Sequence, residues 1–270
     1  MRGLVDELFG VEKPVIGVVH LLPLPGSPRY GGSLEEVLER ALADAGALVE
    51  GGVDGLILEN FGDKPFPKRR ISREGLAAFA VVAREVVREV SIPVGINVLR
   101  NDALSAMAIA YASGARFIRV NVYADVVAAD QGIVEPAAWD VLRYRRWLGA
   151  DVRVYADVLV KHSRPLYPAD IETSVKNAVG RGLADAVIVT GPETGAPPDL
   201  SRLRAAKRAA GSAPVFAGSG VVPENAVEVL AIADGAIVGT YFKIGGITEN
   251  PVDRERVERL VSLVRRFYRK

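Results

Sequence analysis

The side chains best suited to chemistry lie together in one run, Asp157-Val158-Leu159-Val160-Lys161-His162-Ser163. A lysine that is shielded from water can lose its proton near neutral pH and attack a carbonyl carbon to form a Schiff base. A neighbouring histidine can carry protons. The more usual role for such a lysine is to neutralise a substrate phosphate without forming a bond. We therefore expect Asp157, Lys161 and His162 to be catalytic, with Lys161 either an electrostatic clamp or a Schiff-base former.

Further polar side chains end or follow other apolar runs. Glu59 follows Gly55-Leu56-Ile57-Leu58, and because side chains alternate along a strand it shares a face with Ile57. We expect Glu59 to be a fourth catalytic group that transfers a proton, a role it shares with Asp157 and His162. The side chains expected to bind and orient a substrate lie at or near comparable strand ends: His20, Asn97, Arg119, Asn121, Thr190 and Glu193.

Arg119 and Asp157 each interrupt an apolar run with a charge. A charge is expensive to bury without a partner, so we expect these two to pair with each other or with Glu59. The competing interpretation is an internal ion pair that only holds the fold together.

Two glycine-rich turns near the C-terminus predict a binding site for an anion. Val215-Phe216-Ala217-Gly218-Ser219-Gly220 and Gly235-Ala236-Ile237-Val238-Gly239-Thr240 both end a short apolar run, and one short helix fits between them. Backbone amides at such turns can converge on a phosphate, as they do after the last two strands of many (β/α)8 barrels. The groups expected to hold the phosphate are Gly191, Gly218, Ser219, Gly220, Gly239 and Thr240.

Metal-ligating residues are scarce. The chain has two histidines, His20 and His162, and no cysteine. A closed structural zinc site, a disulfide and thiolate catalysis are therefore not expected, and no cofactor is evident. Mg²⁺ held by Glu59 or Asp157 together with substrate oxygens stays open.

Eight apolar runs, each followed by an amphipathic helical pattern, would position these residues. Without a linker or break in composition, this alternation predicts one α/β domain, a single (β/α)8 TIM barrel over residues 1–270 with residues 1–13 as a lead-in. An open doubly wound sheet is disfavoured because Leu22-Pro23-Leu24-Pro25-Gly26, after the first strand, lacks that fold's glycine fingerprint. The expected strands are residues 15–19, 55–58, 94–98, 117–120, 153–159, 186–189, 214–217 and 235–238. Loops 61–71, 123–136 and 191–199 are candidate lids.

Composition narrows the classes of partner. With 34 basic and 33 acidic residues the net charge is +1, which gives no global attraction to nucleic acid or to an anionic membrane. No apolar stretch is long enough for a transmembrane segment, and the N-terminus lacks the pattern of a signal peptide. We expect a cytoplasmic protein that forms a homo-oligomer, and the low Met and Cys content also suits a thermophile.

Several long motifs resemble the BtpA/SgcQ family. They include Val18-Val19-His20-Leu21-Leu22-Pro23-Leu24-Pro25-Gly26, Pro93-Val94-Gly95-Ile96-Asn97-Val98-Leu99-Arg100-Asn101-Asp102 and Thr190-Gly191-Pro192-Glu193-Thr194-Gly195. The resemblance covers nearly the whole chain and implies a TIM barrel of the ribulose-phosphate-binding type. One member type is associated with photosystem I biogenesis in cyanobacteria, and others resemble sugar-utilisation enzymes; the resemblance supplies no reaction.

The residues and the resemblance together predict an enzyme that acts on a small phosphorylated metabolite, either a sugar phosphate or a nucleoside-derived phosphate. Isomerisation, carbon–carbon lyase or aldolase chemistry and glycosyl-bond chemistry are all open. The alternative is a non-catalytic assembly or stability factor for a membrane complex, which would have no need for an acid, a base and a cation converging in one pocket.

Overall fold

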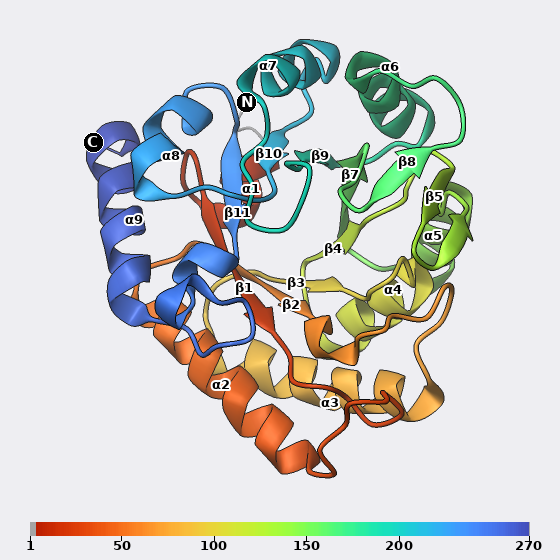
Figure 1. The fold of residues 1–270 in the computed structure, drawn as a ribbon, viewed down its shortest axis with the longest axis vertical. Helices are drawn as coiled ribbons and strands as arrows, with labels where there is room; N and C mark the ends of the chain where they lie inside the picture. The colour runs from red at the N-terminus through yellow and green to blue at the C-terminus, as the bar shows by residue number, and fades with distance from the viewer. Residues whose placement is uncertain (1–3, 270) are drawn as a thin grey trace.

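Eight short apolar segments form parallel strands that close into a barrel surrounded by helices (Figure 1). The computed structural model describes residues 4–269. Around the barrel the strands follow the order β1-β11-β10-β9-β7-β4-β3-β2. The expected (β/α)8 fold is confirmed. The strands are β1 (Val15–His20), β2 (Gly55–Glu59), β3 (Val94–Asn97), β4 (Phe117–Val120), β7 (Arg153–Val158), β9 (Ala186–Val189), β10 (Val215–Ala217) and β11 (Gly235–Val238).

The outer helices begin where the sequence supplies a capping side chain. The Ser33 hydroxyl accepts a hydrogen bond from the Glu36 amide at 3.1 Å, and five further helices begin with a serine or aspartate that caps in the same way. The helices are α1 (Leu4–Phe9), α2 (Leu34–Glu50), α3 (Arg73–Glu89), α4 (Ala103–Ser113), α5 (Ala138–Leu148), α6 (Ile171–Lys176), α7 (Leu200–Ala209), α8 (Pro223–Leu230) and α9 (Arg254–Tyr268). Short helical turns add η1 (Phe61–Asp63), η2 (Asn177–Arg181), η3 (Thr240–Phe242) and η4 (Ile244–Gly246).

The barrel interior is apolar and aromatic at its amino-terminal end. The Phe117 ring fills the space that a Cβ on Gly95 would need, so this glycine makes room for the aromatic layer. From α1, the Phe9 ring packs on Phe117 and Phe216 with centroids 6.0 and 6.4 Å apart. The lead-in helix therefore packs against the aromatic layer at the amino-terminal end of the barrel.

The loop after the fourth barrel strand, which the sequence suggested as a lid, contains regular secondary structure. Its residues form β5 (Val127–Ala129) and β6 (Gly132–Val134), and β5 also pairs with β8 (Ser163–Pro165). This small antiparallel sheet connects the loop after β4 to the segment that carries Lys161 and His162. The segment is thereby fixed on the rim of the barrel.

Two features of the outer surface bear on partners. Among residues 4–269, no helix is both long enough and apolar enough to span a bilayer. The basic helices α5 and α9 lie on opposite sides of the barrel in Figure 1, so their arginines do not make one continuous basic face.

Candidate functional site

The upper layer of the barrel interior is polar because the strand alternation that buries apolar residues below ends in charged or amide side chains. His20 pairs in register with Glu59, and Glu59 with Asn97. Arg119 lies two residues beyond Phe117 on the same face of β4, and Asp157 occupies the corresponding place beyond Tyr155 on β7. The predicted residues therefore meet at the carboxyl end of the barrel.

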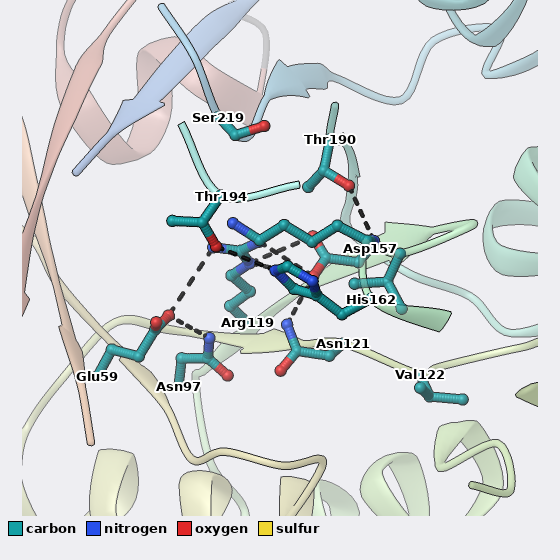
Figure 2. Close-up of polar contacts among 12 residues, drawn as sticks. Glu59, Asn97, Arg119, Asn121, Val122, Asp157, His162, Thr190, Thr194 and Ser219 are labelled. Carbon is teal, nitrogen blue, oxygen red and sulfur yellow. Dashed lines mark hydrogen bonds and ion pairs between the residues drawn. The ribbon is translucent and has the colours of Figure 1, made fainter. Parts of the chain in front are cut away.

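Arg119 is the centre of this layer, and Figure 2 shows it between two carboxylates. Its Nε lies 3.2 Å from both oxygens of Asp157, and its Nη2 donates to Asp157 Oδ2 at 3.1 Å. Its Nη1 lies 3.9 Å from Glu59 Oε2. Both predicted pairings of Arg119 are thus present, and its side chain is only 5% exposed.

Two asparagines complete the network. Asn97 Nδ2 donates to Glu59 Oε2 and Asn121 Nδ2 donates to Asp157 Oδ2, both at 2.6 Å (Figure 2). Asn121 Oδ1 is buried and has no hydrogen-bond partner among residues 4–269. A buried acceptor without a donor is costly, so Asn121 Oδ1 has the capacity to accept a further hydrogen bond.

The backbone at Lys161 is held from both sides. Its amide donates to Thr190 Oγ1 at 3.2 Å, and its carbonyl accepts from Arg100 Nη2 at 2.9 Å. Leu159 and His162, close on either side, have left-handed backbones with φ of 46° and 57°. Non-glycine residues rarely adopt this conformation, and such strain concentrates at functional sites.

The charge state of Lys161 is shifted by its surroundings. Burial first, and then the positive charge of Arg119, lower the pKa of Lys161 to about 8. No carboxylate lies within 4.0 Å of its amine anywhere in the described chain. An amine with this pKa is partly neutral near pH 8 and can act as a base or as a nucleophile.

The two histidines lie in different environments. Burial, followed by the positive charges of Lys243 and Lys161, holds the pKa of His20 well below its usual value, so this ring is neutral. His20 Nδ1 is buried and unpartnered within the described part of the chain. His162 Nε2 lies 3.1 Å from Thr194 Oγ1, and burial followed by the charge of Lys161 lowers its pKa too.

The polar layer opens onto two adjoining cavities. One, of about 210 Å³, extends from His20 to the turns after β10 and β11 and includes Gly218, Gly220 and Gly239 in its lining. The other, of about 670 Å³, lies between η1 and the small antiparallel sheet. We call them the glycine compartment and the outer compartment. Both are lined by Glu59, Phe61, Arg119, Lys161 and Thr194.

The groups expected to hold a phosphate divide into two sets. The Gly218 amide donates to Val189 O at 2.9 Å, the Gly191 amide donates to Ser219 Oγ at 2.9 Å, and Ser219 Oγ donates to Ala196 O at 2.9 Å. These three groups already have protein partners. Gly220, Gly239 and Thr240 line the glycine compartment together with Ser219, and the Thr240 hydroxyl lies 3.0 Å from Thr248 Oγ1.

Other predicted site residues lie away from the cavities or behind their walls. Glu193 is exposed on the loop after β9. Thr190 supports the Lys161 backbone, and Asn97 and Asp157 contact the cavity residues Glu59 and Arg119. Thr190, Asn97 and Asp157 thus hold Lys161, Glu59 and Arg119 in place.

Sequence reasoning missed two arginines. Arg100 follows β3, is 6% exposed and lines the outer compartment. Arg256 lies in the first turn of α9 and lines the glycine compartment; its Nε donates to Tyr241 O at 2.6 Å. Arg100 belongs to the motif from Pro93 to Asp102 that resembles the BtpA/SgcQ family, and this was the signal that could have identified it. Neither arginine continues the apolar pattern of a strand.

The site offers no acid cluster for a metal. Among residues 4–269, no group of three or more histidines and carboxylates is placed to hold an ion. The Arg119 guanidinium lies between Glu59 and Asp157, the two carboxylates considered for Mg²⁺, and would repel a cation there. These residues do not fit a magnesium site.

Comparison with known proteins settles the family. A family model described as the BtpA family matches residues 11–266. The chain belongs to the BtpA family. It is similar to the photosystem I biogenesis protein BtpA of Synechocystis sp., with 49% identity over 95% of this chain and 89% of that protein. It is also similar to the putative sgc region protein SgcQ of Escherichia coli, with 32% identity over 97% and 98%.

Solved structures place this BtpA-family chain among known TIM barrels. Wild-type GGGPS from Thermoplasma volcanium aligns over 100% of both chains with a TM-score of 0.62 and 14% identity. N-(5'-phosphoribosyl)anthranilate isomerase from Pyrococcus furiosus aligns over 94% of this chain and 99% of its own, with a TM-score of 0.55 and 19% identity. At these identities the likeness establishes the fold.

Proposed function

We propose that the protein is an enzyme that acts on a small phosphorylated substrate, a sugar phosphate or a nucleoside-derived phosphate, at the mouth of the barrel. The observation that carries this proposal is the position of Lys161. With Glu59 and Arg119 it lines both compartments, and one compartment ends at the glycine turns. A proton-transfer group, a fixed cation and glycine backbone thus line two adjoining cavities, an arrangement suited to catalysis on an anionic substrate.

The phosphate would lie in the glycine compartment. Its ligands would be the backbone amides of Gly220 and Gly239, the Thr240 hydroxyl and the Arg256 guanidinium, all of which line that space. The position after the last two barrel strands supports this assignment, since phosphate sites of (β/α)8 enzymes are frequent there. The named activity of the phosphoribosyl isomerase, a structural neighbour, agrees with it.

The reacting part of the substrate would then lie beside Lys161 and Glu59. Glu59 can accept a proton, and a neutral Lys161 can accept a proton or attack a carbonyl carbon. Arg119 and Asn121 would orient hydroxyl or carbonyl oxygens. These roles suit isomerisation, carbon–carbon bond cleavage and glycosyl-bond chemistry, all of which begin with a proton transfer or a polarised carbon.

The competing hypothesis is a non-catalytic assembly factor, and the name of the Synechocystis relative is the observation that favours it. Such a factor needs an outer surface for its partner but no convergent cavity. The acid, amine and guanidinium buried around one space therefore favour the enzyme. Binding of small ligands at the barrel mouth separates the two hypotheses.

Phosphorylated metabolites are expected to raise the melting temperature, and the same molecules without the phosphate are not. A ligand at 100 times its Kd stabilises by about 2.7 kcal/mol, which corresponds to roughly 5–10 °C for a domain of this size. Differential scanning fluorimetry with pairs such as ribose 5-phosphate and ribose measures this difference. Equal shifts within each pair, or no shift with any phosphate, would exclude the proposed phosphate site.

Replacing Gly239 with alanine is expected to weaken phosphate binding at least tenfold. A Cβ at Gly239 would lie 2.9 Å from His20 Cε1, so the imidazole, which lines the same compartment, must shift. Gly46→Ala in α2 is the matched control, because its Cβ meets nothing within 4 Å. That control should keep wild-type binding and gain about 0.5–1 kcal/mol of stability. Isothermal titration with inorganic phosphate or a sugar phosphate measures the affinity of the two variants. Unchanged binding in Gly239→Ala would place the phosphate elsewhere.

A further inference from the structure

The outer compartment contains a buried guanidinium that the proposed chemistry does not use. Arg100 is 6% exposed and lines this space. Its Nη2 donates to the carbonyl of Lys161 at 2.9 Å, while its Nε is buried and has no partner among residues 4–269. Within the same residues no carboxylate lies within 4.0 Å of it. Arginine stays protonated in proteins, so Arg100 is a buried positive charge without a direct counter-ion.

The other charges around the outer compartment are neutralised or lie at its edge. Lys64 pairs with Glu249 at 3.0 Å. Arg119 is paired with Asp157 and faces Glu59.

The remaining carboxylate of this lining, Asp130, is exposed and accepts from Gln131 Nε2 at 2.6 Å. Asp130 and Asp157 oppose the lowering of the Arg100 pKa by burial, but neither contacts the guanidinium. Arg100 and Lys161 are therefore the two cations that face this space without a carboxylate in contact.

A buried charge of this kind is stabilised when an oppositely charged group enters the cavity. The planar guanidinium has donors spaced to match two oxygens of a carboxylate or a phosphate, and such charge-assisted bonds are stronger than neutral ones. The volume of about 670 Å³ leaves room for this group and for the carbon chain that carries it. Because the two compartments meet at Lys161, one molecule can reach both.

We propose that the outer compartment binds a second anionic group of the substrate through Arg100. The substrate class is then a molecule with a phosphate at one end and a carboxylate or second phosphate at the other, as in phosphorylated sugar acids and sugar bisphosphates. This inference rests on the proposed function, which places the first phosphate in the glycine compartment. Lys161 would lie between the two anchors, beside the central carbons.

Isothermal titration with matched probes tests this inference on the wild-type protein. 6-Phosphogluconate and fructose 1,6-bisphosphate carry two anionic ends, glucose 6-phosphate carries one phosphate, and gluconate carries one carboxylate. We expect each two-ended probe to bind at least tenfold tighter than glucose 6-phosphate, and gluconate to bind weakest. Equal affinity of the one-ended and two-ended phosphates overturns the inference but leaves the proposed function intact. If none of the phosphates binds, both fall.

Two variants assign the preference to a residue. Arg100→Gln should remove the tenfold preference and leave the affinity for glucose 6-phosphate within about twofold, and Arg100→Lys should restore part of the preference. Arg256→Gln, at the other end of the cavity, should weaken one-ended and two-ended phosphates alike. If Arg100→Gln lowers all affinities equally, Arg100 only positions the Lys161 backbone and the inference is wrong. The ratio within each variant is independent of a modest loss of stability.

Discussion

Pyridoxal 5'-phosphate followed by borohydride is expected to modify Lys161 ahead of every other lysine in the chain. The reagent carries a phosphate for the glycine compartment and an aldehyde that a neutral amine can attack. With a pKa of about 8, the unprotonated fraction of Lys161 at pH 7.5 is about 200 times that of an ordinary lysine. The amine nitrogen adds to the aldehyde carbon, water leaves, and hydride from borohydride reduces the imine to a stable secondary amine. Peptide mass spectrometry locates the added group.

The pH dependence of this labelling follows from the lowered pKa. Below pH 8 the amine is mostly protonated, so the initial rate should fall about tenfold for each further pH unit. Above pH 8 the labelling rate of Lys161 should level off, and ordinary lysines should begin to react only at higher pH. A labelling midpoint near pH 10 would show that Lys161 behaves as an exposed lysine.

Lys13 is the matched control for reactivity outside the site. Burial lowers its pKa as well, but Lys13 lies just before β1, at the opposite end of the barrel, where its amine donates to Ala233 O at 2.7 Å. Inorganic phosphate should protect Lys161 and leave Lys13 unchanged, and pyridoxal without the phosphate should label Lys161 more slowly. Any turnover found with a phosphorylated substrate should fall about 10²- to 10⁴-fold in Lys161→Met. Labelling that phosphate does not reduce would contradict the assignment.

The fold could be predicted from the sequence because its determinants are local. Apolar runs of three to six residues, each followed by a helix, specify the strand–helix units, and the number of units gives the barrel. The polar upper layer could be predicted for the same reason: alternation along β2 and β4 places Glu59 and Arg119 above Ile57 and Phe117. These inferences need only the neighbours of each residue in the chain.

The rest of the site depends on contacts between distant segments. Arg256 reaches the glycine compartment from α9, where its Nε donates to Tyr241 O at 2.6 Å. The sequence showed that Gly191 and Ser219 end strands, but not that they hydrogen bond to each other at 2.9 Å. The small sheet that fixes the Lys161 segment pairs β5 with β8, more than thirty residues apart. Periodicity within one element carries no information on such pairings.

Replacing Arg119 with methionine is expected to destabilise the protein by about 3–5 kcal/mol, because Asp157 then remains buried without its cation. The Asp157 side chain is 0% exposed and would retain Asn121 Nδ2, at 2.6 Å, as its hydrogen-bond donor. For a chain of this size the melting temperature should fall by on the order of 10 °C. The double variant Arg119→Met/Asp157→Leu removes both charges and should recover most of this loss of stability. Ligand binding should be lost in the single and in the double variant. Calorimetry and titration with a sugar phosphate measure the two effects separately.

A second buried ion pair provides the matched control. Lys243 Nζ and Asp44 Oδ2 lie 2.8 Å apart with side chains 0% and 2% exposed, and neither residue lines the two compartments. In Lys243→Met, Asp44 keeps Arg40 Nε at 3.3 Å, so the variant should cost a smaller free energy of unfolding than Arg119→Met and leave ligand affinity unchanged in the folded protein. If the Arg119/Asp157 double variant binds ligands as the wild type does, this pair only holds the barrel together, and the polar layer around it has no part in substrate recognition.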